Sequence, residues 1–167
     1  MSEIDSKVVP HFQDELEELK ARLLVMAGEA EEQLRLAVSS LVNRDHDLVE
    51  RVLQSDDVIN RLHLEVDGRC FKLHALYQPM AVDLRVIVSA LKINSDLERV
   101  GDFAVNIAEA ARKYLEHPAV KPLIDIPRMG AMAQEMLRDS LNAYIGHDST
   151  LAPVSYTHLT LPTSDLV

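Results

Sequence analysis

An apolar residue recurs every three or four positions along the first part of the chain, and this spacing restricts the possible folds most strongly. The series has steps of 4, 3, 4, 3, 4, 4, 3 and 4 residues. Its members are Phe12, Leu16, Leu19, Leu23, Met26, Ala30, Leu34, Ala37 and Leu41. Such spacing puts one face of an α-helix against a core. We therefore predict a long amphipathic helix with a coiled-coil-like seam and with Pro10 in its first turn.

Two further helices are predicted from the same periodicity. The polar run 43–47 interrupts the pattern and can cap a second helix, which is expected from about Leu48 to Tyr77. Pro79 suits the first turn of a third helix, which is expected to reach about Leu115. The residues expected to face inward on these two helices are Leu48, Val52, Ile59, Leu62, Val66, Cys70, Leu73 and Leu76, then Met80, Leu84, Ile87 and Leu91.

These three helices predict an all-α fold. Long helices joined by short connections pack antiparallel to their neighbours, so residues 10–116 are expected to form an antiparallel three-helix bundle. Hydrophobic residues make up 47% of the chain, whereas aromatic residues make up only 4% and tryptophan is absent. This composition suits aliphatic packing between helices better than a sandwich or a barrel.

A fourth helix is expected to begin an incomplete second repeat. Residues 117–127 contain three prolines and are expected to form a linker, and a helix is expected over residues 128–152. Shifting the sequence by 103 positions gives seven identities in a window of 26 residues. The identities pair Met26 with Met129, Ala30 with Ala133, Glu32 with Glu135, Leu34 with Leu137, Arg35 with Arg138, Asp45 with Asp148 and Leu48 with Leu151.

The last segment, residues 153–167, follows neither the heptad nor the repeat. Its sequence, PVSYTHLTLPTSDLV, resembles the in-frame translation of a transposase adaptor used for sequencing libraries. We therefore expect residues 153–167 to be non-native and the natural protein to be longer, and we exclude the segment from fold reasoning.

The charge and cysteine content exclude several classes of function. A formal net charge of −10 argues against a nucleic-acid surface and is compatible with cations or basic proteins as partners. Cys70 is the single cysteine, so no internal disulfide can form and a reducing compartment is expected. The chain shows no signal peptide and no apolar run of roughly 18 residues, so membrane insertion is not expected.

Four oxygen-bearing side chains lie four residues apart on the predicted third helix: Asn94, Glu98, Asp102 and Asn106. Two carboxylates one turn apart repel each other, and a hard cation would offset that repulsion because it prefers oxygen ligands. A solvated face neutralised by Arg99 is the alternative. One helix supplies too few ligands, so a metal site would need a second helix or subunit.

Other metal and phosphate motifs are absent from the sequence. No histidine follows an acidic residue by three positions, which disfavours a ferritin-like di-iron centre. There is no glycine-rich phosphate loop and no Cys/His metal pattern. A basic stripe is formed by residues seven positions apart: Arg85, Lys92 and Arg99. It serves either solubility or contact with an acidic partner. Asp83 suits the start of the helix, where a carboxylate interacts favourably with the helix dipole.

The stretch QPMAVDLRVIVSALKINSDLERVGDFAVNIAE resembles the signature of the PhoU family of phosphate-uptake regulators. The segments HFQDELEELKARLLVMAGEAEEQL and DLVERVLQSDDVIN are similar to the family as well, so the resemblance covers about residues 10–152. It implies two three-helix bundles in tandem, each with a Glu/Asp-x-x-x-Asp metal motif. Glu98 and Asp102 match the first motif, and the second would fall beyond the end of this chain. In some members of the family an acidic residue stands at the position of Asn106. A histidine is frequent at the position where this chain has Phe103.

The resemblance also implies a function. The expected protein is a non-enzymatic cytoplasmic regulator that restrains high-affinity phosphate uptake by docking to the transporter ATPase and to the phosphate sensor histidine kinase. It implies a homodimer and bound metal ions such as Mg, Mn, Fe or Zn. Candidate partner-contact residues are Asp83, Arg85 and Arg99. A carboxylate metal-storage bundle and a purely structural helical module are the alternatives.

Overall fold

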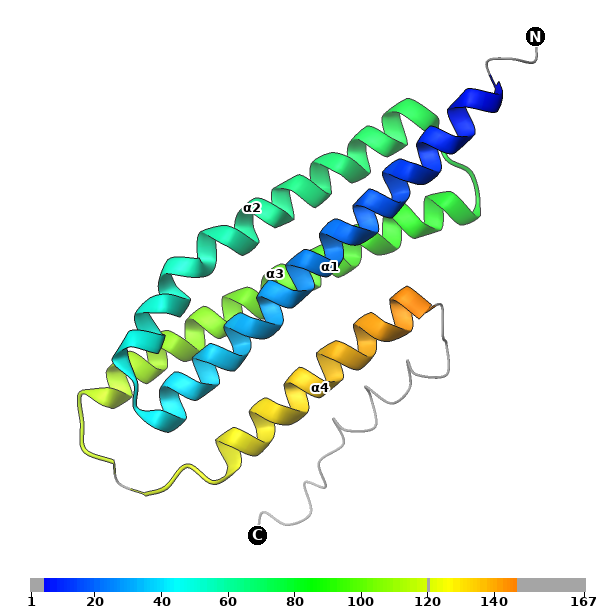
Figure 1. Cartoon of the computed structure of the whole chain (residues 1–167). Helices are drawn as coiled ribbons and strands as arrows, with labels where there is room; N and C mark the ends of the chain where they lie inside the picture. The colour runs from blue at the N-terminus through cyan, green and yellow to red at the C-terminus, as the bar shows by residue number, and fades with distance from the viewer. Residues whose placement is uncertain (1–4, 120, 147–167) are drawn as a thin grey trace.

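The computed structural model describes residues 5–119 and 121–146, which contain four helices and no strand. Their bounds are α1 Asp5–Asn43, α2 His46–Tyr77, α3 Val82–Leu115 and α4 Asp125–Gly146. Figure 1 shows the α2–α3 connection at the same end of the molecule as the start of α1, with the α1–α2 turn at the other end. None of the helices in these residues is both long and apolar enough to cross a membrane.

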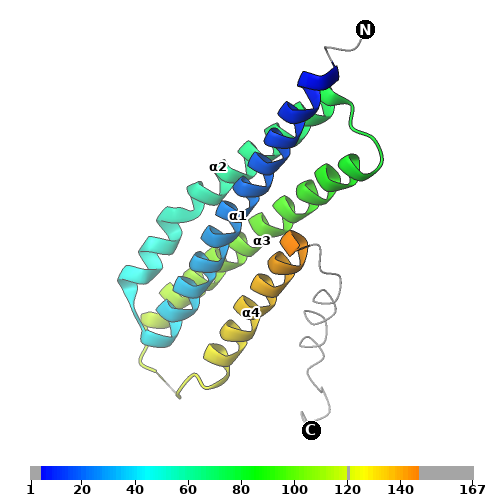
Figure 2. The ribbon, with the colours of Figure 1, turned by 45° about the vertical axis from the view of Figure 1, so that its right-hand side comes forward.

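The first three helices form the predicted antiparallel bundle. Each of α1, α2 and α3 packs against the other two, and α4 lies along α1 on the outside of the bundle. The two views in Figures 1 and 2 agree on this arrangement. The all-α prediction is therefore confirmed.

The buried positions recur every three or four residues, and on α3 the two steps alternate without a break. On α3 they are Ile87, Ala90, Asn94, Leu97, Gly101, Ala104, Ala108, Ala111 and Leu115. On α1 the same alternation continues past Ala30 through Gln33, Ala37 and Ser40. Leu34 and Leu41, predicted as core positions, are only partly buried, and Leu41 packs against the second of the two apolar core clusters described below. The position of a residue in this repeat therefore decides whether it is buried, and polar side chains occupy some of the buried positions.

Five other residues expected to face inward are not fully buried. Leu84 is only partly buried, and Leu48 and Leu91 are partly buried against the two core clusters. Leu76 is exposed near the end of α2, and Met80 is exposed in the connection that follows. Both lie where the chain leaves the bundle, so no neighbouring helix covers them.

The core consists of two apolar clusters separated by a polar layer. One cluster lies towards the α2–α3 connection and includes Leu19, Met26 and Ile87. The other lies towards the α1–α2 turn and draws on a row of alanines from α3. Between them, Nε2 of the buried Gln33 donates a 2.8 Å hydrogen bond to the Ser55 carbonyl. That bond satisfies the donor of an amide that would be costly to bury alone.

The α1–α2 turn is fixed by two side chains from the predicted polar break. The Asp45 carboxylate caps α2 by accepting hydrogen bonds from the backbone N–H groups of Asp47 and Leu48 at 2.9 and 3.1 Å. Arg44 donates from Nη2 to the Leu115 carbonyl at 3.1 Å. The same arginine lies over the Tyr114 ring, with 4.9 Å from Cζ to the ring centroid. Together these contacts tie the turn to the end of α3.

Three predicted helix starts differ from the structure. Helix α1 begins at Asp5, so Pro10 lies past its first turn. Helix α3 begins at Val82, because Gln78 and Ala81 take positive φ angles of 45° and 49° and interrupt the helix around Pro79. Helix α4 begins at Asp125, which places Pro127 in its first turn, where the missing N–H costs nothing.

Helix α4 packs antiparallel to α1. Gly130 lies against Val38, and Arg138 forms an ion pair with Glu31 near the middle of α1. A Cβ atom built on Gly130 would lie only 2.8 Å from Val38 Cγ1, so the glycine permits this close approach.

The face of α4 that corresponds to the core face of α1 is largely uncovered. Under the shift of 103 residues, the α1 residues Met26, Ala30, Gln33 and Ala37 correspond to Met129, Ala133, Met136 and Ser140. All four α1 residues are buried, whereas none of their α4 equivalents is. The second repeat stays a prediction, and further helices of such a repeat would cover that face. The predicted repeat residues 147–152 and the tail 153–167 lie outside the described residues.

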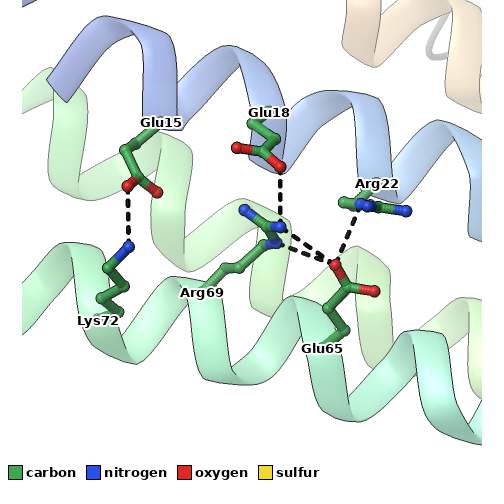
Figure 3. Close-up of polar contacts among 6 residues, drawn as sticks. All are labelled: Glu15, Glu18, Arg22, Glu65, Arg69 and Lys72. Atoms are coloured by element: carbon green, nitrogen blue, oxygen red, sulfur yellow. Dashed lines mark hydrogen bonds and ion pairs between the residues drawn. The ribbon is translucent and has the colours of Figure 1, made fainter. Parts of the chain in front are cut away.

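A row of ion pairs closes the edge between α1 and α2 (Figure 3). Glu15 accepts from Lys72 Nζ at 2.8 Å, and Glu18 accepts from Arg69 at the same distance. Glu65 on α2 bridges Arg69 and Arg22. The hydrogen bond from Lys72 lowers the pKa of the Glu15 carboxyl below its ordinary value. These pairs are partly solvated, so they contribute little to the free energy of folding. Their main effect is to set the alignment of α1 against α2.

Two glycines should respond oppositely to substitution. A Cβ atom built on Gly101 would lie 2.9 Å from Cδ1 and 3.3 Å from Cγ2 of the buried Ile59, whereas one built on Gly28 meets nothing within 4 Å. We expect Gly101→Leu to destabilise the fold by about 3 kcal/mol, because it overpacks the α2–α3 contact. The control Gly28→Ala should stabilise it by about 0.5–1 kcal/mol. Urea unfolding of both variants tests this, and equal effects would contradict the close approach of α2 to α3.

Candidate functional site

The predicted oxygen strip on α3 turns gradually from the core to the surface. Asn94 is fully buried, Glu98 is half-buried, and Asp102 and Asn106 are exposed. The reason is helical geometry, since four residues advance more than one full turn and each step rotates the strip by about 40°. The four side chains therefore do not share one environment, and the strip is not a uniform row of ligands.

Asn94 is a contact between two helices. Its Nδ2 donates to the His63 carbonyl at 3.0 Å and to Asp67 Oδ1 at 2.9 Å, both on α2. Its Oδ1 is buried and has no hydrogen-bond partner among the described residues. The sequence did not reveal the role of Asp67, although Asn94 occupies a seam position of the heptad, where polar residues often fix register.

Glu98 and Asp102 are the carboxylates of the strip that remain accessible. The expected neutralisation by Arg99 does not occur with either of them, because Arg99 Nη1 pairs with Asp96 Oδ1 at 3.4 Å. Gly101 lies between the two acids on the side facing α2 and allows the close approach to Ile59. The close approach of a neighbouring helix thus explains the glycine in this helix.

The fit of a metal ion to this pair is incomplete. Two carboxylates one helical turn apart suit a hard cation, which takes six or more oxygen ligands. However, within residues 5–119 and 121–146, no group of three or more His, Cys, Asp or Glu side chains is placed to hold a metal ion. Any ion at Glu98 and Asp102 would need further ligands from outside these residues.

The candidate partner-contact residues differ in accessibility. Arg85 and Arg99 are exposed, and with the exposed Lys92 they follow one side of α3 at seven-residue intervals. Asp83 is half-buried in the first turn of α3, where a carboxylate interacts favourably with the helix dipole. The exposed Phe103 lies near the far end of the same helix. The basic stripe is thus available to a partner, whereas Asp83 is only partly so.

Two histidines and the single cysteine of α2 lie outside the oxygen strip. His63 is half-buried, with Nε2 3.8 Å from Asp67 Oδ2, and His74 is exposed. Cys70 is fully buried in the first core cluster, and burial raises the pKa of its thiol to about 11. A thiol with so high a pKa is a packing group and a poor nucleophile.

An isosteric substitution separates a helix contact from a metal ligand at position 94. We expect Asn94→Asp to lower the free energy of unfolding by about 2–3 kcal/mol at neutral pH, since it removes two donated hydrogen bonds and buries a charge beside Asp67. Burial and the neighbouring charge would raise the pKa of the introduced carboxyl, so the loss should fade as the pH falls through that pKa.

The matched control is Asn106→Asp at the exposed end of the strip, which should change stability by no more than about 0.5 kcal/mol. Chemical unfolding of both variants between neutral and acidic pH provides the measurement. An equal, small effect at the two positions would show that Asn94 does not join α2 to α3.

Comparison with known proteins identifies the fold and its relatives. A family model described as the PhoU domain matches residues 23–111. The phosphate-specific transport system accessory protein PhoU homolog of Aquifex aeolicus is 42% identical over 138 residues, which cover 83% of this chain and 62% of that protein. The homolog of the same name from Pseudomonas putida is 37% identical over 142 residues, which cover 84% and 56% of the two chains.

Solved structures agree with these matches. The crystal structure of PhoU from Pseudomonas aeruginosa matches with a TM-score of 0.82 and 35% identity over 86% of this chain and 69% of that one. PhoU from Streptococcus pneumoniae matches with a TM-score of 0.79 and 29% identity over 87% and 69%. The chain spans about three-fifths of the length of the two relatives named above. The matched domain, the identities and the shared bundle together show that this chain belongs to the PhoU family.

Proposed function

We propose that this chain is the N-terminal part of a regulator of phosphate uptake that works by docking to other proteins. The observation that carries the proposal is the 42% identity, over 138 residues, to a protein named as an accessory protein of phosphate-specific transport. The proposed partners are the transporter ATPase and the phosphate sensor histidine kinase, both met in the cytoplasm. No substrate is turned over, and the regulator acts by restraining these partners when phosphate is plentiful.

The exposed side of α3 supports docking. Arg85, Lys92 and Arg99 present three positive charges in one line on a molecule whose formal net charge is −10. A local basic stripe on an acidic protein orients an acidic partner surface and speeds its association. We therefore propose that Arg85 and Arg99 contact a partner and that Asp83 mainly supports the start of α3.

We further propose that Glu98 and Asp102 contribute to a metal site that is completed from outside the described residues, by a later part of the protein or by another subunit. The accessible pair of carboxylates supports this, because the ion pair to Arg99 is made by Asp96. Carboxylates at this spacing suit Mg, Mn, Fe or Zn, and the bound ion would join the elements that supply its ligands.

Deleting the full-length gene that encodes this sequence tests the regulatory function. We expect a phosphate-responsive reporter to stay active at high phosphate in the deletion strain, because the restraint on uptake is lost. Reintroduced full-length protein should restore repression, whereas the Arg85→Glu/Arg99→Glu variant should not. The control Arg112→Glu, on an exposed arginine outside the stripe, should restore repression fully. Normal repression in the deletion strain would rule out the regulatory function.

Metal binding is tested separately on the full-length protein by titration calorimetry with Mn²⁺ and Zn²⁺. We expect Glu98→Gln/Asp102→Asn to weaken binding by at least about tenfold, because two charged ligands are lost. The control Asp96→Asn/Glu109→Gln removes the same charge from exposed acids of the same helix and should bind as the parent does. Equal affinity of both double variants would place the metal elsewhere.

A further inference from the structure

The outer side of α3 carries an open hollow that no described part of the chain fills. It has a volume of about 410 Å³ and is lined by Val88, Leu91, Lys92, Ser95 and Asp96. Val88 is 42% exposed and Leu91 is partly buried, so apolar surface is open to solvent there. The short Ser95 donates its hydroxyl to the Leu91 carbonyl at 3.2 Å, so it leaves room without an unpaired polar group. This place, here called the α3 hollow, is therefore suited to apolar side chains of another molecule.

Positive charge borders the α3 hollow. Arg85 and Lys92 are both exposed, and neither is paired with an acid in the part of the chain that the structure describes. Asp96 is the acid in the lining, and its Oδ1 is paired with Arg99 Nη1 at 3.4 Å. The accessible acids of the oxygen strip follow further along α3, so the positive charge is concentrated towards Arg85 and Lys92. On a molecule with a formal net charge of −10, an acidic surface is attracted to this place and repelled by most others.

The spacing of the two basic residues indicates what kind of molecule fits. Arg85 and Lys92 are seven residues apart, which is about 10.5 Å along the helix axis. One small anion is too short to pair with both. Two acids seven residues apart on a second helix have the same spacing, and Val88 and Leu91 lie between the basic residues as apolar positions lie between flanking charges in a heptad. The α3 hollow therefore suits an amphipathic helix with acidic flanks.

We propose that the α3 hollow is a docking site for an acidic amphipathic helix of a partner protein. Apolar side chains of that helix pack on Val88 and Leu91 beside Ser95, and its acids pair with Arg85 and Lys92. The apolar contacts supply most of the affinity, whereas the charges orient the helix and speed its association. This inference rests on the proposed function, because it specifies the partner surface that the regulator binds.

A substitution that fills the α3 hollow tests the proposal in the full-length protein. The binding probes are the purified transporter ATPase and the purified cytoplasmic part of the sensor kinase. Ser95 is exposed, so Ser95→Phe should leave the circular dichroism spectrum unchanged. We expect it to raise the dissociation constant for at least one probe by about tenfold or more, because the ring occupies the space of the partner's side chains. The control Gln54→Phe adds the same ring at an exposed position of α2 and should bind as the parent does.

Two binding results would overturn the proposal. One is equal affinity of Ser95→Phe and the parent for both probes. The other is the absence of binding of either probe to the parent at about 100 µM, a concentration at which even a weak complex forms.

The charge of the partner is tested by the rate of association. We expect Lys92→Glu to slow association by about tenfold at low salt, and the difference from the parent to shrink as salt screens the charges. The control Lys113→Glu makes the same change at an exposed position near the end of α3 and should leave the rate close to that of the parent. A parent association rate that does not depend on salt would contradict an acidic partner.

The phosphate-responsive reporter separates this inference from the proposed function. In the deletion strain, full-length Ser95→Phe should fail to restore repression, whereas Gln54→Phe should restore it. Repression restored by Ser95→Phe would overturn docking in the α3 hollow and leave the regulatory function standing. Normal repression in the deletion strain itself would overturn the regulatory function and this inference with it.

Discussion

The bundle depends on inward positions that recur every three or four residues, and this spacing is kept even where the residue is polar. Gln33, Ser40 and Asn94 all lie at such positions and are all buried. Each makes a hydrogen bond to a helix backbone: Gln33 to the Ser55 carbonyl, Ser40 to the Ala37 carbonyl and Asn94 to the His63 carbonyl. Because an unpaired amide in this core would be costly, the bonds of Gln33 and Asn94, which each join two helices, favour one register over its alternatives. The bond of Ser40 stays within α1 and only satisfies its hydroxyl.

The same alternation explains how one helix can serve both the core and the candidate site. A strip of residues four apart rotates by about 40° around the helix axis at each step, so it moves gradually from the core to the surface. On α3 it begins at Asn94, which binds α2, and passes Glu98 to reach the exposed Asp102. The carboxylates are thus attached to the most firmly held part of α3. A ligand at Glu98 and Asp102 would act on a rigid helix whose register Asn94 and Gly101 have already set.

The sequence predicted the helices and their antiparallel order, because periodicity reports the number of long amphipathic segments. It was wrong for Met80 and placed Leu34 and Leu41 too deep, because apolar character was taken as the mark of an inward position. Gln33 and Ser40 are polar yet buried, which shows that the position of a residue in the helical repeat decides its burial instead. Asn94 was predicted as an oxygen ligand from its four-residue spacing to Glu98. Its Nδ2 donates to residues 27 and 31 positions away in the chain, and no local pattern reports such a contact.

The three helices of the bundle each have one outer face, and the faces differ in chemistry. That of α1 is partly covered by α4, with Gly130 against Val38. That of α3 carries the basic stripe and the accessible acids. That of α2 carries exposed apolar side chains, among them Leu64 and Phe71. Since the three faces point in different directions around the bundle, a molecule bound at one of them would leave the other two accessible.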